Sequence, residues 1–360
     1  MLTAADHEFM GQALELGGRG LYTTTPNPRV GCVIVGNGAV VGAGWHEKAG
    51  MPHAEVLALK AAGGRSRGAT LYVNLEPCSH HGRTPPCVDA IIEAGIKRVV
   101  AAMRDPNPKV AGAGFAKLRA AGIAVEQGPR EDEARELNIG FVARMTRGRP
   151  WMRMKVAASL DGRTALANGK SQWITGEAAR ADGHRWRARA CAILTGFGTV
   201  RDDDPRLTVR GVDTPRQPLK IVVDSKFETS PSARLLKEGK TLVVGAVNDA
   251  GRIAALKGAG AEIAIVPNDG GKVELFKLME ELARRELNEI HVEAGTKLNG
   301  SLLQAGVVDE LLVYLAPSVI GDSGRGMFSL PELTELSRIR GLKTHEVERI
   351  GEDIRIVARV

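Results

Sequence analysis

The sequence has few cysteines and no long apolar run, and each shortage excludes a class of protein. None of its apolar stretches approaches the ~18 residues needed to span a bilayer. The first residues, MLTAADHEFM, lack the basic and then apolar pattern of a signal peptide. Four cysteines in 360 residues are too few for a disulfide scaffold. We therefore expect a cytoplasmic protein that has no membrane partner.

Aromatic residues and clustered basic residues are also scarce. Aromatics make up 4% of the chain, so few side chains are available for stacking on single-stranded nucleic acid. The formal net charge is +7, which suits anionic ligands, but the basic residues form no run of five or six. This charge favours a small phosphorylated ligand slightly over RNA, and we predict no nucleic-acid partner.

Strand and helix patterns alternate along the chain and predict an α/β protein of two domains. Strand-like segments include VGCVIV, ATLYVNL, CAILTG and LKIVVD, and helical segments with glycine or proline at their ends lie between them. The segment TRGRP (residues 146–150) is basic, contains glycine and proline, and follows a helical segment. We place the domain boundary there, which gives domains of residues 1–147 and 148–360.

A histidine and two cysteines of the first half are candidate metal ligands. His53 follows Pro52 at the start of a predicted helix, and the loop EPCSHHGRTPPC contains Cys78 and Cys87. Two prolines before Cys87 suit a helix start, where a thiolate is stabilised. One imidazole and two thiolates leave the fourth tetrahedral position to water, which is the layout of a catalytic zinc site.

Glu55 is the candidate proton carrier at this site. It lies two residues after His53, or about 200° around a helix, so the two side chains are not equivalent ligands. A carboxylate beside a metal-bound water can move a proton from that water to a leaving amine. We predict Zn²⁺ bound by His53, Cys78 and Cys87, with Glu55 as the catalytic residue. A surface histidine–glutamate pair and two buried thiols are the alternative interpretation.

These residues resemble the signature of the zinc-dependent nucleoside deaminases, H-x-E followed by P-C-x-x-C. His53 to Glu55 and the pair Pro77-Cys78 match it, but eight residues instead of two separate the cysteines. The longer spacer SHHGRTPP, with TPNPRVGCVIV and AGMPHAEVLAL, is similar to the bifunctional deaminase/reductase family of riboflavin biosynthesis. That resemblance implies a cytidine-deaminase-like α/β/α domain.

The same resemblance suggests which deaminase residues contact the substrate. Asn27 in TPNP would contact a substrate amide, and an Asx turn is its alternative role. His80 would face the substrate, with a surface histidine as the alternative, and His81 is equally open. Both histidines lie in the spacer, which would shape a pocket for a phosphorylated pyrimidine.

The segment VEAGTKLNGSLL (residues 292–303) predicts a strand, a glycine turn and a helix beginning near Leu298. Backbone N–H groups at such a turn can bind phosphate, although the pattern is common. The segments MKVAASLDGRTA, SQWIT, ILTGFGTVRDDDPRLTVR and IVVDS precede it in that order. Together they resemble the reductase half of the same family, which implies a dihydrofolate-reductase-like α/β fold that uses NADPH.

The resemblance implies two sets of contacts in the second half. NADPH would contact Ala157, Trp173, Thr199, Asp203, Ser225, Gly295, Thr296, Lys297, Leu298, Asn299, Gly300 and Ser301. Substrate would contact Ser171, Arg187, Leu207, Arg210 and Glu293. Arg187 and Arg210 suit a ribose phosphate, because guanidinium groups bind phosphate oxygens in paired hydrogen bonds. Without the family, solvent-exposed arginines would be as good an interpretation. Lys155, on the strand of Ala157, could face the site.

The sequence therefore predicts two consecutive activities. The resemblance implies hydrolytic deamination of 2,5-diamino-6-ribosylamino-4(3H)-pyrimidinone 5′-phosphate, and then NADPH-dependent reduction of its ribosyl side chain. The final product would be 5-amino-6-(5-phosphoribitylamino)uracil, and the family expectation for assembly is a homodimer. Two alternatives remain at this point: a deaminase that flips a base from RNA, and a structural zinc module with an attached binding domain.

Overall fold

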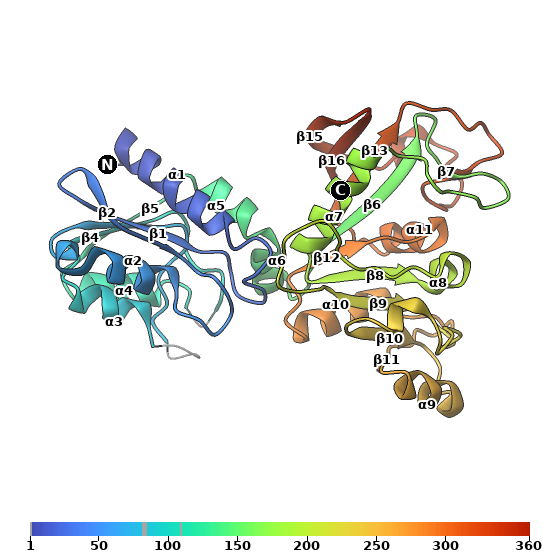
Figure 1. Ribbon diagram of the computed structural model, residues 1–360, viewed down its shortest axis with the longest axis horizontal. Coiled ribbons are helices and arrows are strands. Elements are labelled where there is room, and N and C mark those ends of the chain that lie inside the picture. The colour runs from blue at the N-terminus through green and yellow to red at the C-terminus, as the bar shows by residue number, and fades with distance from the viewer. Residues whose placement is uncertain (1, 81–84, 109) are drawn as a thin grey trace. The chain divides into compact units, whose positions relative to one another are not determined.

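The computed structural model describes residues 2–80, 85–108 and 110–360. The chain divides into two compact units, Met1–Gly148 and Arg149–Val360, and each contains a large sheet with helices on both faces (Figure 1). The α/β class predicted from the sequence is therefore confirmed. Within the described ranges, no helix is both long enough and apolar enough to cross a membrane.

The first unit is a three-layer α/β/α sandwich, in which β1 pairs antiparallel with β2 and β3, and β3, β4 and β5 are parallel. In spatial order, its strands over the described residues are β2 (Ala39–Trp45), β1 (Gly31–Gly36), β3 (Thr70–Val73), β4 (Arg98–Ala101) and β5 (Ala124–Gln127). The helices are α1 (Ala4–Gly18), α2 (Ala54–Ala62), α3 (Cys87–Glu93), α4 (Ala113–Ala120), α5 (Glu131–Leu137) and α6 (Ile139–Arg147).

Alternation along the strands explains the two helical layers of this unit. On β1, Cys32 and Ile34 pack with α2, α3 and α4, whereas Val33 and Val35 pack with α1 and α5. Figure 1 shows these two groups of helices on opposite sides of the sheet. Both cores are made of buried, mostly apolar side chains, so both faces of the sheet are covered.

Two glycines of β2 hold α2 unusually close to the sheet. A Cβ atom at Gly42 would lie 2.3 Å from the carbonyl oxygen of Ala58, and one at Gly44 would lie 2.7 Å from that of Ala54. Only glycine fits such an approach of helix to strand. The glycines of AVVGAGW therefore position the first turn of α2, which contains Glu55.

The second unit is built on a mixed sheet in which the run from β11 to β13 is parallel and β13, β16 and β15 are antiparallel. In spatial order, the described strands are β11 (Glu262–Ile265), β10 (Thr241–Gly245), β9 (Leu219–Val223), β8 (Ala192–Gly196), β12 (Glu289–Val292), β6 (Trp151–Ser159), β13 (Glu310–Ala316), β16 (Asp353–Arg359) and β15 (Lys343–Ile350). A small separate pair is formed by β7 (Arg163–Ala165) and β14 (Arg325–Gly326).

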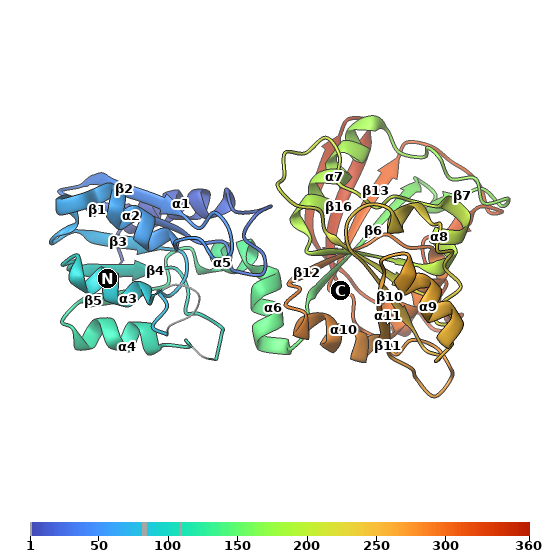
Figure 2. The ribbon, with the colours of Figure 1, turned by 60° about the horizontal axis from the view of Figure 1, so that its bottom comes forward.

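Helices cover both faces of this sheet. They are α7 (Glu177–Arg189), α8 (Phe197–Asp203), α9 (Ala250–Gly258), α10 (Leu275–Arg284) and α11 (Thr296–Gln304). On one face, α10 and α11 pack on Met152, Met154 and their neighbours. On the other, α7 packs on β13 and β16 through Leu312, Tyr314 and Val357 (Figure 2). The alternate β6 residues Lys155 and Ala157 therefore share the face of α7.

Candidate active sites

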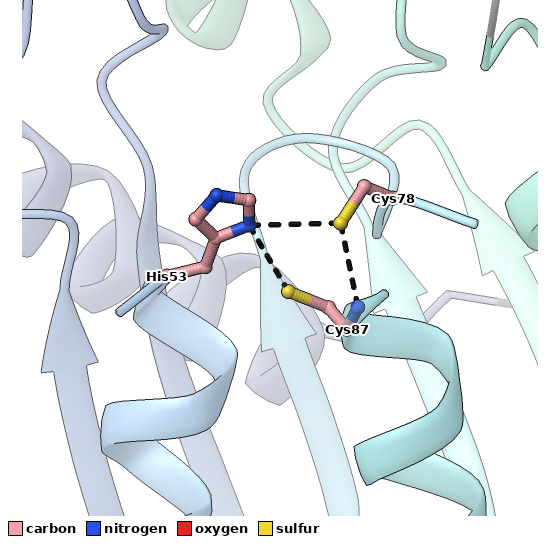
Figure 3. Close-up of side chains that lie close together, drawn as sticks. All are labelled: His53, Cys78 and Cys87. Atoms are coloured by element: carbon pink, nitrogen blue, oxygen red, sulfur yellow. Dashed lines mark hydrogen bonds between the residues drawn. The ribbon is translucent and has the colours of Figure 1, made fainter. Parts of the chain in front are cut away.

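The candidate zinc ligands come together at the end of the first unit's strands. His53 is the N-cap residue of α2, Cys87 is the first residue of α3, and Cys78 lies in the segment after β3. His53 Nδ1 lies 3.2 Å from Cys87 Sγ and 3.6 Å from Cys78 Sγ, and the three side chains point toward one another (Figure 3). The predicted grouping of these residues is thus present in the fold.

This donor set fits a zinc ion. The three ligand atoms all lie within 4.8 Å of one another. Tetrahedral zinc with ordinary Zn–S and Zn–N bonds separates its ligand atoms by about 3.4–3.8 Å, so small movements would complete the geometry. One nitrogen and two sulfurs are also the donors that zinc prefers.

The two cysteines differ in their pKa values, because their sulfur atoms take part in different hydrogen bonds. The backbone N–H of Cys87 donates to Cys78 Sγ at 3.3 Å, so the start of α3 stabilises the thiolate of Cys78. The pKa of Cys78 is lowered to about 4, because the Cys87 side chain and then His53 stabilise its thiolate against the cost of burial. Hydrogen bonding to that thiolate raises the pKa of Cys87. The start of α3 thus stabilises the thiolate of Cys78, and not that of Cys87 as the sequence predicts.

Glu55 lies in the first turn of α2 and only 3% of its side chain is exposed. Burial raises its pKa, although the charge of His53 opposes the shift. A raised pKa makes the carboxylate a stronger base, which favours its use in general acid–base catalysis. The position and environment of Glu55 therefore suit the proton carrier predicted from the sequence.

His46 was missed from the sequence, and it orients Asn27. Asn27 Nδ2 lies 3.0 Å from His46 Nε2, and His46 Nδ1 lies 3.1 Å from the carbonyl oxygen of Pro52. The ring is buried, and its centroid lies 5.3 Å from that of His53. Burial lowers the pKa of His46, so the neutral ring donates from Nδ1 to Pro52 and accepts at Nε2 from Asn27. His80 is exposed, and His81 lies outside the described residues.

In the second unit, Arg187 and Glu293 bind each other. Arg187 on α7 donates through Nε and Nη2 to the two carboxylate oxygens of Glu293, and the Nη2–Oε2 distance is 2.8 Å. Its Nη1 donates to the carbonyl oxygen of Thr208 at 2.9 Å. Glu293 follows directly after β12, so the pair joins the end of a central strand to the covering helix. Two of the predicted substrate contacts are thus neighbours.

Basic groups surround this pair. The backbone N–H of Arg210 donates to His184 Nδ1 at 3.2 Å, and its Nη1 donates to Thr208 Oγ1 at 3.1 Å. Burial, and then the charges of Arg187 and Arg210, lower the pKa of His184 to about 4. Burial also lowers the pKa of Lys155, against the attraction of Glu293. So much positive charge favours an anionic ligand, such as a phosphate.

His184 and His291 were not singled out from the sequence. His184 lies three residues before Arg187 on a predicted helix, and that spacing could have indicated a shared face. His291 is fully buried, and its Nε2 lies 3.3 Å from Glu293 Oε1. Burial lowers its pKa, so a neutral ring borders the carboxylate. No sequence spacing distinguishes His291 from an ordinary strand residue.

The start of α11 offers backbone N–H groups to a cofactor. The helix begins after Gly295, two residues before the predicted start at Leu298. A Cβ atom at Gly295 would lie 3.8 Å from Thr199 Oγ1, so these two predicted cofactor contacts are neighbours. The first N–H groups of a helix have no acceptor within it, which suits phosphate oxygens. This cradle fits the phosphate groups of NADPH.

The other predicted cofactor and substrate contacts are more dispersed. Asn299 is buried, and a Cβ atom at Gly300 would lie 1.9 Å from the carbonyl oxygen of Ser329, so both residues face the protein interior. Trp173 is 70% exposed, and the Arg180 guanidinium lies 4.7 Å from its ring. The backbone N–H of Val273 donates to Ser225 Oγ at 3.3 Å. Of the remaining predicted contacts, Leu207 is buried; Ala157, Ser171, Thr296 and Leu298 are partly buried; and Asp203, Lys297 and Ser301 are exposed.

The fold and the two clusters define a zinc-dependent deaminase joined to a reductase. Residues 3–103 match the family described as the cytidine and deoxycytidylate deaminase zinc-binding region. Residues 150–356 match the RibD C-terminal domain family. These two matches agree with the cytidine-deaminase-like and dihydrofolate-reductase-like domains predicted from the sequence.

Full-length relatives extend the match over the whole chain. The riboflavin biosynthesis protein RibD of Escherichia coli strain K12 is 47% identical, over 97% of this chain and 98% of the relative. The RibD of Aquifex aeolicus is 43% identical, over 98% of both chains. Among solved structures, Acinetobacter baumannii RibD (form 1) is 42% identical with a TM-score of 0.92, over 99% of this chain and 98% of that one.

The chain belongs to the RibD family of riboflavin biosynthesis proteins. It is a bifunctional enzyme with a zinc-binding deaminase domain and a reductase domain, as predicted. The predicted cofactors, Zn²⁺ and NADPH, are those of this family, and the His53, Cys78 and Cys87 cluster is a donor set for the metal. A solved Thermotoga maritima structure, 35% identical with a TM-score of 0.88 over 99% of this chain and 98% of that one, is described as a diaminohydroxyphosphoribosylaminopyrimidine deaminase/5-amino-6-(5-phosphoribosylamino)uracil reductase.

Proposed function

We propose that this enzyme deaminates 2,5-diamino-6-ribosylamino-4(3H)-pyrimidinone 5′-phosphate and then reduces the ribosyl side chain of the deaminated compound. The description of the Thermotoga maritima relative supports both steps. The product of the second step is 5-amino-6-(5-phosphoribitylamino)uracil. The substrates are phosphorylated pyrimidines, not nucleic acid, and the enzyme acts in the cytoplasm.

The cluster of His53, Cys78 and Cys87 beside buried Glu55 carries the proposal. A zinc ion held by His53, Cys78 and Cys87 would lower the pKa of a bound water molecule toward about 7. Glu55 would take up a proton from that water and deliver it to the exocyclic amine, while the water oxygen bonds to the ring carbon and the carbon–nitrogen bond breaks to release ammonia. Because Glu55 is fixed in the first turn of α2, its carboxyl group stays beside the ligand His53. Asn27, oriented by His46, hydrogen-bonds the pyrimidine.

In the reductase domain, NADPH supplies the hydride, and the protein positions the two reactants. Arg187 and Arg210 bind the ribose phosphate, and Glu293 holds the guanidinium of Arg187 in orientation. The backbone N–H groups at the start of α11 bind cofactor phosphate, with Thr199 at their side. Along the rest of the cofactor lie Ala157, Trp173, Asp203 and Ser225, and along the substrate lie Ser171 and Leu207.

A coupled assay tests the two-step function. The full-length enzyme receives zinc, NADPH and the diamino substrate, and both ammonia release and NADPH oxidation are followed. We expect ammonia first and then oxidation of NADPH in equal amount. Oxidation of NADPH without ammonia release would contradict the order of the two steps. Adding a zinc chelator should stop ammonia release and leave reduction of the deaminated compound intact.

Changing Glu55 to Gln separates the two activities. General acid–base catalysis contributes about 10²–10⁴-fold, so ammonia release should fall by that factor, whereas reduction of the deaminated compound should not change. Glu93, exposed at the end of α3, gives the matched control, and Glu93→Gln should retain both activities. Full deaminase activity in Glu55→Gln would contradict the role of Glu55 as proton carrier.

We also propose that the enzyme is a homodimer, as the family resemblance implies. Sedimentation equilibrium should then give a mass twice the 38.3 kDa of the chain. A mass of one chain at micromolar concentration would contradict this assembly.

A separate binding experiment tests the nucleic-acid alternative. Salt-sensitive binding to tRNA would support the base-flipping deaminase considered from the sequence.

A further inference from the structure

Glu76 is a buried carboxylate that accepts hydrogen bonds from one neighbouring segment. Its side chain is 3% exposed and lies two residues before Cys78. Among the described residues, Oε2 accepts from the backbone N–H of Asp105 at 3.1 Å and of Gly112 at 2.9 Å. Oε1 accepts from the N–H of Gly114 at 3.0 Å and of Phe115 at 3.2 Å. Such bonds to an ionised group are stronger than those between neutral groups.

The backbone of the two segments is also in direct contact. A Cβ atom at Gly114 would lie 2.1 Å from the carbonyl oxygen of Pro77, the residue between Glu76 and Cys78. The N–H of Glu76 donates to the carbonyl oxygen of Met103 at 3.0 Å, which continues the pairing of β3 with β4 past their ends. The ligand-bearing segment is therefore joined to Met103, Asp105, Gly112, Gly114 and Phe115 by backbone and side chain together.

We infer that Glu76 is a positioning residue of the deaminase site, which holds Cys78 in place for the metal by joining its segment to the backbone of Asp105, Gly112, Gly114 and Phe115. The inference rests on the proposed zinc site and deepens it. Metal ligands need distances correct to a few tenths of an ångström, and groups behind the ligands maintain them. Asp105, Gly112 and Gly114 also follow the carboxyl end of β4, beside the end of β3, and ligands of open α/β sheets bind at that edge.

A carboxylate suits this role because all four of these backbone N–H groups need an acceptor. Glutamine keeps the size of Glu76, but its NH₂ group would face two backbone N–H donors where an acceptor is needed. The Glu76→Gln change therefore removes two of the four hydrogen bonds that the carboxylate accepts, without opening a cavity. The Gly114→Ala change disturbs the contact between the same two segments, because the added methyl group would clash with the carbonyl oxygen of Pro77.

Cobalt substitution tests the inference without depending on activity alone. Cobalt(II) accepts the same tetrahedral donors as zinc, and its visible absorption reports their geometry. In the full-length protein, Glu76→Gln and Gly114→Ala should each shift the cobalt spectrum and lower kcat/KM for deamination at least about tenfold, the value of one lost hydrogen bond. Reduction of the deaminated compound, measured on the same preparation, should be unchanged and shows that the reductase unit is intact, while circular dichroism and a cooperative melting transition show that the deaminase unit is folded.

The controls are Glu93→Gln and Gly64→Ala, since Glu93 is exposed and a Cβ atom at Gly64 meets nothing within 4 Å. Both should keep the wild-type spectrum and activity. A lower melting temperature with the wild-type cobalt spectrum and kcat/KM in both test variants would overturn the inference. If Glu76→Gln does not fold, the cobalt spectrum and kcat/KM of Gly114→Ala alone test the inference. Failure of the wild-type chain to bind cobalt would instead contradict the zinc site itself.

Discussion

Arg187 and Glu293 form a two-point ion pair at the candidate reductase site, with Nη2 and Oε2 2.8 Å apart. Burial raises the pKa of Glu293, but Arg187 outweighs it and lowers the pKa well below its ordinary value. The carboxylate is thus charged at neutral pH and fixes the plane of the guanidinium. Because Nη1 is also held by Thr208, an arriving phosphate meets a guanidinium that is already oriented.

Arg187→Lys should impair reduction while leaving deamination intact. An ammonium keeps the charge but cannot form the paired hydrogen bonds to Glu293 or to phosphate. Losing one charged hydrogen bond costs about 1.5–3 kcal/mol, so kcat/KM for the reductase step should fall about 10- to 100-fold. Steady-state kinetics with the deaminated compound measure this fall in kcat/KM. The control is Arg185→Lys on the same helix, where the side chain is 64% exposed. Equal activity of the two variants would contradict a role in substrate binding.

The same ion pair should make the reductase domain sensitive to acid. Since the pKa of Glu293 in the folded state lies below its ordinary value of 4.5, the charged pair stabilises the fold fully above pH 4.5. That stabilisation is lost as the pH falls from 4.5 through the folded pKa. The melting temperature of wild type should therefore exceed that of Glu293→Gln at about pH 6, and the difference should shrink as the pH falls below the ordinary pKa of the carboxyl. Calorimetry measures it, with the reductase transition identified by its shift on adding NADPH. A pH-independent difference would rule out this linkage.

His46→Ala should weaken substrate binding in the deaminase domain. Without the ring at 3.0 Å, Asn27 loses the partner that orients its amide, so KM should rise about tenfold, the value of one neutral hydrogen bond. Zinc content should stay at one ion per chain, because His46 is not a ligand. If His46 acts through Asn27, the double variant His46→Ala/Asn27→Ala should be no worse than Asn27→Ala alone. Additive losses would show an independent role for His46.

These cases show which parts of the site a sequence can reveal. His53, Cys78 and Cys87 could be grouped because a proline precedes each of them, and the helix pattern places His53 and Cys87 at helix starts. His46 could not, since its importance comes from a contact with Asn27 across 19 positions that no periodicity encodes. The pairing of Arg187 with Glu293 likewise depends on how α7 lies over the sheet.

The fold was predictable to a similar extent. Parallel strands that are buried on both faces, such as β8 and β10, are continuous apolar runs and stand out in the sequence. The edge strand β15 does not, because KTHEVERI is exposed along most of its length and has no apolar alternation. The strand forms because its backbone pairs with β16, and its own side-chain pattern does not indicate this pairing. Helix propensity alone also could not predict that α11 begins at Thr296 and not at Leu298.

Gly42→Ala should destabilise the deaminase domain and disturb its active site together. The added methyl group would lie 2.3 Å from the carbonyl oxygen of Ala58, so α2 must move away from β2. Overpacking of this kind costs about 1–3 kcal/mol of unfolding free energy. Because α2 begins beside His53 and Glu55, its displacement should also lower kcat for deamination, while reduction continues at the wild-type rate. Urea unfolding and the two activity assays measure these effects. Gly18→Ala is the control, since a methyl group there meets nothing within 4 Å. Equal stability of the two variants would show that α2 tolerates a wider spacing from the sheet than its contacts indicate.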